Sequence, residues 1–367
     1  MICGAVVVGP VWIASTPLRQ GKDGEQIGTL SIGIDRASIE SFLSEAQNLF
    51  WLTGLIAVLA GLLLAQALGG AVAAPVEELV SGTRRVAQGD LNVRFRTESR
   101  DELSQLGAAF NEMVAGLQER ERLQQELNLA REIQRTLLPR ALPALPGWQL
   151  SAHYQPAREV GGDFYDFIPL PDSRLGLVIG DVAGKGVPAA LVMATARSLL
   201  RAAALRLASP GAVLEQVNDL LHPDIAPKMF VTCLYAVLDP ASGHLQFANA
   251  GHDSPYQRRA GGVTELRARG MPLGALPGMR YEEREIQLAP ADCVLFYTDG
   301  LVEAHNARRE MFGFPRLKAL LEGHRSSGAA MIPMLLDELR RFTGGRGEQE
   351  DDVALVVLER RMDHDSV

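Results

Sequence analysis

One stretch of the chain, from Ala46 to Val76, contains no charged residue. Its apolar centre, Leu49–Leu68, is long enough for a helix to cross a bilayer, which takes roughly 20 residues. Trp51 lies near one end of this stretch, as interfacial aromatic residues do. A buried helix of a soluble core is the alternative, but the length and the lack of charge favour the membrane. We therefore expect a transmembrane helix over residues 47–69, with separately folded parts before and after it.

The segment before this stretch has the pattern of two strands. Val11–Leu18 and Ile27–Ile34 are largely apolar, and a polar turn containing glycine separates them. Two strands alone do not make a stable domain. The segment resembles the last strands of an extracytoplasmic Cache or PAS-like sensor. Residues 1–45 are therefore expected to be the end of such a domain, with the chain starting partway through it and an earlier membrane span missing.

A heptad pattern follows the apolar stretch. One helical pattern runs from Pro75 to Val86, Gly89-Asp-Leu91 interrupts it, and a second begins near Asp101. Apolar residues in the second pattern are spaced three, four, three and four apart, as in a coiled-coil seam. These residues are Leu103, Leu106, Phe110, Met113 and Leu117. An amphipathic helical hairpin would also show heptads. Together with the preceding span, however, the segment resembles a HAMP domain, here residues 70–121, which implies a parallel homodimer.

The second helix is expected to continue as a coiled-coil linker over residues 122–147, which Pro139 and two further prolines end. Its seam consists of Leu123, Leu127, Ala130, Gln134 and Leu137. Leu117 and Leu123 lie six residues apart, so the two seams are out of phase, which locally alters coiled-coil winding. We predict a strained, two-state joint at Glu119–Arg122, with a plain solvated spacer as the alternative.

From Trp148 onwards, short strand patterns alternate with paired helix patterns. The predicted strands are Gln149–Tyr154, Phe164–Leu170, Leu175–Asp181, Met229–Asp239, His244–Ala250, Glu282–Leu288, Cys293–Tyr297 and Val353–Leu358. The predicted helices are Pro188–Leu207, Pro210–Leu221, Phe314–Glu322 and Ala329–Phe342. Strands that follow one another as hairpins indicate antiparallel sheets. The pattern favours an α+β layered sandwich over a doubly wound parallel sheet.

Aspartates stand at four separate strand ends of this region. They are Asp163, Asp181, Asp299 and Asp351, the last followed by Asp352. Carboxylates do not gather at one point without a cation, because like charges repel and desolvation is costly. Mg²⁺ and Mn²⁺ take oxygen ligands and suit such a cluster. A single aspartate after a strand is more often a turn residue or helix cap, an alternative that weighs most on Asp166 and Asp352.

The same region carries an ordered set of short motifs. They are Gly161-Gly-Asp-Phe-Tyr-Asp166, Gly180-Asp-Val-Ala-Gly-Lys-Gly-Val-Pro-Ala-Ala190, Asn249-Ala-Gly-His252, Met271-Pro-Leu-Gly274, Tyr297-Thr-Asp-Gly-Leu-Val-Glu-Ala304, Met311-Phe-Gly313 and Asp351-Asp352. With them, residues 148–360 resemble a PPM-type serine/threonine phosphatase of the SpoIIE or RsbU-like branch. Ala130–Pro139 is similar to the helix that leads into the family's catalytic domain. The resemblance implies an αββα sandwich, here preceded by a transmembrane helix, a HAMP domain and a coiled-coil linker.

The resemblance also implies a site with two Mn²⁺ or Mg²⁺ ions. Asp163 and Asp181 would bridge the two ions and would be the catalytic residues. The remaining ligands would be the carbonyl of Val182 and the carboxylates of Asp299 and Asp351. Asp166 and Asp352 would either support these ligands or replace one of them. Two such ions activate water and clamp the phosphate for in-line attack, so no nucleophilic side chain is required.

Other residues of the motifs have two interpretations each. His252 is either a proton donor to the leaving serine oxygen or, more commonly for such a turn residue, a partner in a structural hydrogen bond. Lys185 either attracts phosphate or is a solvated loop lysine. Cys233 and Cys293 lie in apolar runs without a Cys-x5-Arg loop, so we expect buried free thiols and neither a disulfide nor a zinc site.

A membrane span followed by a HAMP domain also precedes histidine kinases and cyclases. A kinase needs a histidine on the helix after the HAMP domain, but the first histidine of the chain is His153. A diguanylate cyclase could use Gly161–Asp163, but the Glu-Phe that follows there is absent, and Asp299 and Asp351 stay unexplained. A non-catalytic sensor scaffold, which acts by binding its partner, remains the alternative of a different class.

The whole sequence thus predicts a membrane-anchored, signal-regulated protein serine phosphatase. The resemblance implies a phosphorylated STAS-type anti-sigma-factor antagonist as substrate, and a place in the cytoplasmic (inner) membrane with the catalytic domain in the cytoplasm. The net charge of −8 argues against nucleic acid as a partner.

Overall fold

The computed structural model describes residues 5–8, 11–20, 25–96, 101–323, 327–345 and 349–362. The chain divides into two compact units, Met1–Glu121 and Arg122–Val367. Each unit is described by itself.

The first unit begins with a small antiparallel sheet in the order β1-β2-β3. Its strands are β1 (Ala5–Val8), β2 (Val11–Gln20) and β3 (Glu25–Asp35). The two predicted strands are present as β2 and β3. The short strand β1 was not predicted, because a four-residue apolar run is too short to show a period. Ile27, Leu30 and Ile32 of β3 are exposed on this sheet.

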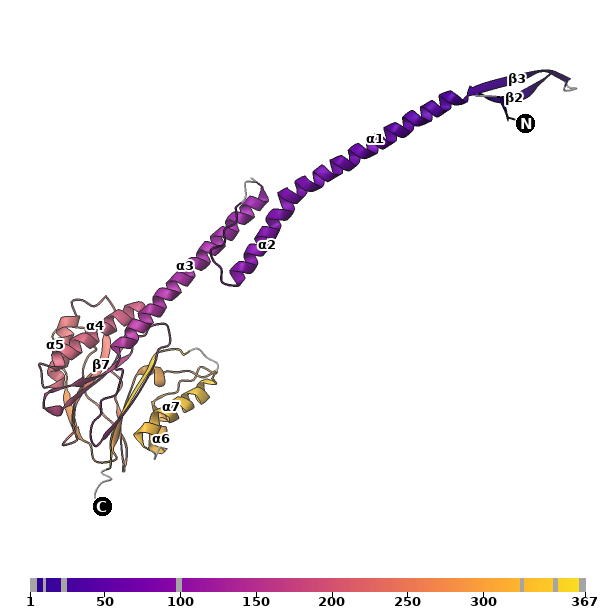
Figure 1. Ribbon diagram of the computed structural model, residues 1–367. Coiled ribbons are helices and arrows are strands. Elements are labelled where there is room, and N and C mark those ends of the chain that lie inside the picture. The colour runs from indigo at the N-terminus through magenta and orange to yellow at the C-terminus, as the bar shows by residue number, and fades with distance from the viewer. Residues whose placement is uncertain are drawn as a thin grey trace. The chain divides into compact units, whose positions relative to one another are not determined.

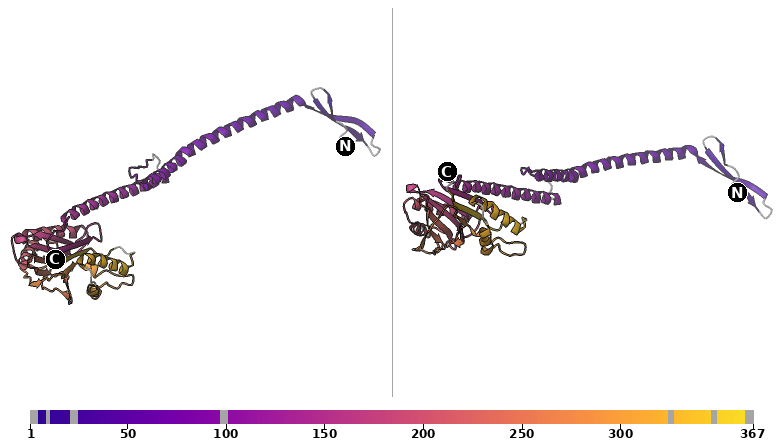
Figure 2. Two further views of the ribbon diagram at one scale, coloured as in Figure 1. Left: turned by 60° about the horizontal axis from the view of Figure 1, so that its bottom comes forward. Right: turned by 90° about the horizontal axis from the view of Figure 1, so that it is seen from below.

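Helix α1 (Arg36–Leu68) follows directly and contains the predicted span (Figure 2). It begins earlier than predicted, because Asp35 caps it by accepting a hydrogen bond from the Ala37 amide at 3.1 Å. Every residue from Leu49 to Leu68 is exposed, and Trp51 is 72% exposed. A helix that is apolar all round and buries none of its side chains is typical of a membrane span. Its length and composition suffice for crossing a bilayer.

Helix α1 continues without a break through a π-helical turn (Gly69–Ala73) into α2 (Ala74–Ala87). Pro75 stands in the first turn of α2, where its missing N–H and its ring disturb the regular i to i−4 bonding. Gly89 then adopts a φ of +92°, which allows the chain to turn back. The predicted helix over residues 75–86 is therefore confirmed.

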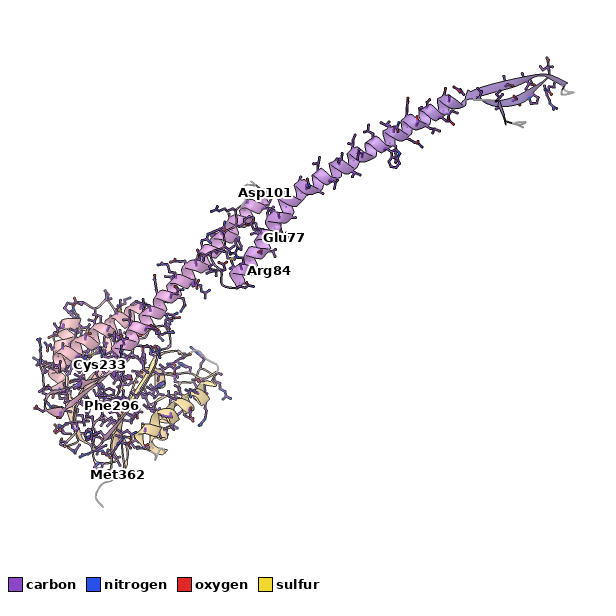
Figure 3. The ribbon with its side chains drawn as sticks, in the orientation of Figure 1. Glu77, Arg84, Asp101, Cys233, Phe296 and Met362 are labelled. Carbon is purple, nitrogen blue, oxygen red and sulfur yellow. The ribbon has the colours of Figure 1, made fainter. Side chains whose placement is uncertain are left out.

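Helix α3 (Glu102–Leu137) packs beside α2, and Asp101 caps its first turn. Figure 3 shows Glu77 and Arg84 on α2 and Asp101 at the start of α3. A small core joins this helical pair, composed of Leu79, Val93, Phe95, Phe110 and Val114. Of the predicted seam, Phe110 is buried in this core, whereas Leu106, Met113 and Leu117 are exposed. Those three side chains remain available to a second copy.

The second unit consists of two five-stranded antiparallel sheets. The first sheet is, in order, β11 (Glu283–Gln287), β8 (His244–Ala250), β7 (Val231–Asp239), β6 (Leu175–Val182) and β5 (Phe164–Pro169). The second is β10 (Gly262–Glu265), β9 (Tyr256–Arg259), β12 (Cys293–Tyr297), β13 (Val353–Arg360) and β4 (Trp148–Gln155).

Helices cover the outer face of each sheet, as Figure 1 shows. The first sheet is covered by α4 (Val187–Ala204) and α5 (Pro210–Leu221), and the second by α6 (Phe314–Gly323) and α7 (Gly328–Thr343). A third apolar cluster fills the space between the sheets. The α+β class and the αββα sandwich are therefore confirmed. Helix α4 is also long and apolar enough to cross a membrane, but it is partly buried as a covering helix.

All eight predicted strands and all four predicted helices of this unit are present, with ends that differ by a few residues. The hairpin of β9 and β10 was not predicted, because each strand has only four residues and few of them are apolar. Cys233 on β7 and Phe296 on β12 lie inside the sandwich (Figure 3). Cys233 and Cys293 are buried free thiols, as expected. Cys3 lies outside the described residues.

Candidate functional site

Asp163 stands immediately before β5 and is only 1% exposed. Its Oδ2 atom is fully enclosed but has no hydrogen-bond partner in the protein. Burial raises the pKa of this carboxyl well above its usual range, and the neighbouring carboxyl of Asp181 raises it further. A buried carboxylate oxygen without a partner costs free energy, so Asp163 fits a cation ligand better than a structural role.

Asp181 lies beside Asp163 because β5 and β6 are antiparallel neighbours, with Phe164 paired to Gly180. The two carboxyl groups are hydrogen-bonded to each other. Burial is the main cause that raises the pKa of Asp181, and the charge of Asp351 adds to it. Two buried carboxyls in contact cannot both be ionised unless a positive charge balances them.

Gly162 explains how the two segments approach each other so closely. A Cβ atom at this position would lie 3.0 Å from the carbonyl oxygen of Val182. The glycine therefore lets the turn before Asp163 pack against the end of β6. Val182 O is thus close to the same corner of the sandwich, in a position to add a neutral oxygen ligand.

Asp299 begins a short 3-10 turn (Asp299–Leu301) directly after β12. Burial raises the pKa of Asp299 to about 7, and the charges of Asp181 and Asp351 contribute. A Cβ atom on the next residue, Gly300, would lie 1.9 Å from the backbone oxygen of Asp352. Only glycine fits there, so it fixes the turn of Asp299 against the start of β13.

The structure distinguishes Asp351 from Asp352. Asp352 is buried, and its carboxylate accepts hydrogen bonds from the backbone amides of Ala157 at 2.8 Å and Gly162 at 2.7 Å. Asp351 is 37% exposed, forms an ion pair with Lys185 at 2.7 Å, and raises the pKa of both Asp181 and Asp299. Asp351 therefore faces the carboxylate cluster, whereas Asp352 holds the backbone of the turn before Asp163.

Asp166 does not join this cluster. It lies within β5, is 1% exposed, and forms ion pairs with Arg197 and Arg201 of α4, each at 2.9 Å. Its Oδ1 atom also accepts a hydrogen bond from the Phe167 amide. The carboxylate thus attaches α4 to the sheet. The expectation that Asp166 supports or replaces a metal ligand finds no place in this geometry.

His252 is buried and has both ring nitrogens occupied. Nε2 lies 3.1 Å from the carbonyl oxygen of Tyr297 and donates to it, while Nδ1 lies 3.0 Å from the hydroxyl of Thr232. Burial lowers the pKa of His252 to about 4, so the ring is neutral near pH 7. The histidine links β7 of one sheet to β12 of the other. Of the two interpretations, the structure supports the structural hydrogen bond.

Asp253, which follows His252, was missed in the sequence analysis. Its Oδ2 atom is buried and has no hydrogen-bond partner. Burial raises its pKa to about 6, and the charges of Glu303 and Asp181 raise it further. Asp253 is thus a fifth carboxyl close enough to influence the cluster. The Asn-Ala-Gly-His motif directly before it was the signal, but the motif was read one residue too short.

The chemistry of the donors fits a hard divalent cation. Asp163 and Asp181 are in contact, Asp299 and Asp351 act on them electrostatically, and all available ligands are oxygen atoms. Within the described residues, no three Asp, Glu, His or Cys side chains already surround one point at ligand distance. Small side-chain adjustments, such as the release of Asp351 from Lys185, would complete a shell of oxygen atoms.

Comparison with known proteins agrees with this geometry. The family model of stage II sporulation protein E (SpoIIE) matches residues 171–361, and the HAMP domain model matches residues 67–119. The first match includes Asp181, Asp299 and Asp351, whereas Asp163 lies just before it. The SpoIIE match covers more than half of the chain.

Two curated relatives are similar over most of the chain. Protein IcfG of Synechocystis is 30% identical over 82% of this chain and 55% of its own length. Phosphoserine phosphatase RsbU of Bacillus subtilis is 28% identical over 70% of this chain and 76% of its own length. The chain therefore spans little more than half the length of the first of these relatives.

Among solved structures, the SiaA-PP2C domain of Pseudomonas aeruginosa superposes with a TM-score of 0.58 and is 26% identical, covering 67% of this chain and 98% of that domain. The RsbU and RsbW domains of a Mycobacterium tuberculosis protein give a TM-score of 0.51 at 31% identity, covering 61% of this chain and 63% of that one. The chain belongs to the SpoIIE family of PP2C-type serine phosphatases and carries a HAMP domain ahead of its phosphatase domain.

Proposed function

We propose that the chain hydrolyses phosphoserine or phosphothreonine in a protein substrate with the help of two Mn²⁺ or Mg²⁺ ions. The observation that supports this most is the enclosed Oδ2 atom of Asp163, which has no partner and lies beside the carboxyl of Asp181. The proposed ligands are Asp163 and Asp181 between the two ions, with Val182 O, Asp299 and Asp351 completing the shell. Bound ions of this kind supply an activated water and neutralise charge on the phosphate.

The protein's own contribution is to hold these oxygen atoms in a rigid corner between the two sheets. Asp163 and Asp181 are fixed by the pairing of β5 with β6, and Asp299 by the packing of Gly300 on Asp352. Burial keeps bulk water away from the carboxylates, which strengthens their interaction with a cation. His252, neutral and bonded on both nitrogens, keeps the two sheets in register and takes no proton in this scheme.

The proposed substrate is a phosphorylated STAS-type protein of a partner-switching pathway. Its support is the similarity to RsbU, named a phosphoserine phosphatase, and to a structure of joined RsbU and RsbW domains. The competing proposal is a scaffold that binds such a protein without hydrolysing it. The described carboxylate set favours hydrolysis, because a scaffold has no use for several buried acidic groups whose desolvation is costly.

We further propose that α1 spans the cytoplasmic membrane, with the phosphatase domain in the cytoplasm, and that the chain forms a parallel homodimer. The uncharged, fully exposed surface of α1 between Leu49 and Leu68 supports the membrane. The exposed seam residues Leu106, Met113 and Leu117 support the dimer, because a coiled-coil seam buries such side chains against a second copy.

The substrate proposal is tested with the purified chain, Mn²⁺ and a phosphorylated STAS protein. Loss of 80 Da per phosphate would be followed by mass spectrometry on the order of minutes, with a phosphotyrosine peptide as the control substrate. We expect release from phosphoserine and none from phosphotyrosine. Stable binding of the phosphorylated STAS protein without any release would favour the scaffold.

A further inference from the structure

Gln134 is a buried polar residue on a helix that is otherwise exposed at that level. It is 5% exposed, whereas Glu132, Ile133, Arg135 and Thr136 around it are exposed. Its side-chain amide bonds to both backbone groups of Gly161. Nε2 donates to Gly161 O at 2.6 Å, and Oε1 accepts from Gly161 N at 3.1 Å. The amide therefore pairs with this residue as a neighbouring strand would.

A second contact, one turn earlier on α3, supports the first. Arg131 Nε donates to the carbonyl oxygen of Glu159 at 2.7 Å. Leu137 and Leu138 pack at the core of the sandwich, at the end of the same helix face. The last turns of α3 are thus fixed along residues 159–161. Gln134 was counted in the predicted coiled-coil seam, but in the structure it packs against its own catalytic domain.

The opposite side of the same backbone segment is held by Asp352. Its carboxylate accepts from Gly162 N at 2.7 Å, and Asp163 N lies 3.4 Å from the same oxygen. A Cβ atom on Gly161 would lie 2.1 Å from that carboxylate, so the segment has no room to shift. Gly161 and Gly162 are therefore clamped between Gln134 and Asp352, directly before Asp163.

We propose that Gln134 is a positioning residue that sets the place of Asp163 and thereby the affinity of the site for its divalent cation. The inference rests on the proposed function, in which Asp163 is a ligand. Its basis is the bidentate bond to Gly161, two residues before Asp163. Because α3 is one continuous helix from Glu102, its last turns become part of the metal site. A helix turns by about 100° per residue, so even a small rotation of α3 would break both bonds.

The test replaces Gln134 by methionine, which keeps the length of the side chain and removes both hydrogen bonds. Glu132→Met introduces the same side chain on the exposed face of the same turn and serves as the matched control. Mn²⁺ affinity is measured on the full chain in detergent by titration calorimetry. Hydrogen exchange of residues 156–163 is measured without metal, and KM is measured for a phosphoserine substrate.

Two neutral hydrogen bonds are lost, so we expect Gln134→Met to bind Mn²⁺ about 10-fold or more weakly. Exchange at Gly161–Asp163 should become faster, while KM and the melting temperature stay close to those of Glu132→Met. A purely structural role would lower the melting temperature without this selective loss of metal affinity. If Gln134→Met does not fold, Gln134→Glu, which keeps the acceptor for Gly161 N, should show a smaller loss in the same direction.

Unchanged Mn²⁺ affinity together with unchanged exchange at Gly161–Asp163 would overturn the positioning role. Failure of the proposed function gives a different result. In that case the wild-type chain binds Mn²⁺ but releases no phosphate, and the effect of Gln134→Met on binding and exchange still decides the role of Gln134.

Discussion

The carboxylate of Asp352 accepts a hydrogen bond from the amide of Gly162 at 2.7 Å, across 190 positions of sequence. The bond connects the start of the last strand to the turn that carries the first proposed metal ligand. Its neighbour Asp351 has the opposite environment, half-exposed and paired with Lys185. Two adjacent aspartates thus have separate tasks, one in holding the backbone and the other facing the cluster.

We expect Asp352→Asn to lower the stability of the phosphatase domain, because an amide cannot accept from all the backbone N–H groups that the carboxylate serves. Leaving such groups unsatisfied costs roughly 1–3 kcal/mol. Asp351→Asn, the matched control, should keep the wild-type melting temperature and lose Mn²⁺ affinity. Thermal unfolding and Mn²⁺ titration of both variants check this. The reverse pattern would exchange the two assignments.

Asp166 provides a second pair of variants. Asp166→Ala leaves the guanidinium groups of Arg197 and Arg201 beside the sheet without their carboxylate. Removing one partner of a buried ion pair costs about 3–5 kcal/mol, so we expect a large drop in melting temperature. Arg201→Ala should have a smaller effect, because Arg201 is the more exposed arginine. Below the melting temperature, Mn²⁺ affinity should match the wild type. A selective loss of metal affinity would show that Asp166 belongs to the site after all.

His252 should make stability depend on pH. Its pKa is about 4 in the folded chain, below the usual value of 6.5, because the ring is buried. The unfolded chain therefore takes up the proton first as the pH falls. The stabilisation is complete above pH 6.5 and is lost between pH 6.5 and pH 4, by about 3 kcal/mol in all. Melting curves of the wild type and His252→Gln over this range should converge towards pH 4. Parallel curves would contradict a buried neutral histidine.

The strand and helix patterns predicted the sandwich well, because each long element carries a clear period. The assignments that failed depend on the partner of a side chain. The pair Asp351-Asp352 could not be separated, since only the fold shows which carboxylate meets the amide of Gly162. Asp166 looked like a site residue until α4 supplied its arginines. Gln134 fits the spacing of a dimer seam and equally the face that packs on Gly161, and sequence spacing cannot tell the two apart.

The phase change in α3 remains a prediction. The helix is continuous through Glu119–Arg122, and Arg122 pairs with Glu126 on its surface. One residue inserted between Glu119 and Arg120 would turn the six-residue step from Leu117 to Leu123 into a heptad. We expect the insertion to fix phosphatase activity at a high or a low level, measured as phosphate release from the dimer. Wild-type activity and wild-type response to the input domain, with an intact dimer, would mean that the joint is a spacer.

Phosphate release from a phosphoserine protein, measured with and without chelator, tests the central claim most directly. We expect the chelator to abolish hydrolysis by the wild type and Mn²⁺ to restore it, because the buried carboxylates act through the cation. Asp181→Asn should be nearly inactive in both conditions, since it loses one of the two carboxyls that meet at the cluster. Full activity of Asp181→Asn in the absence of added metal would contradict the account.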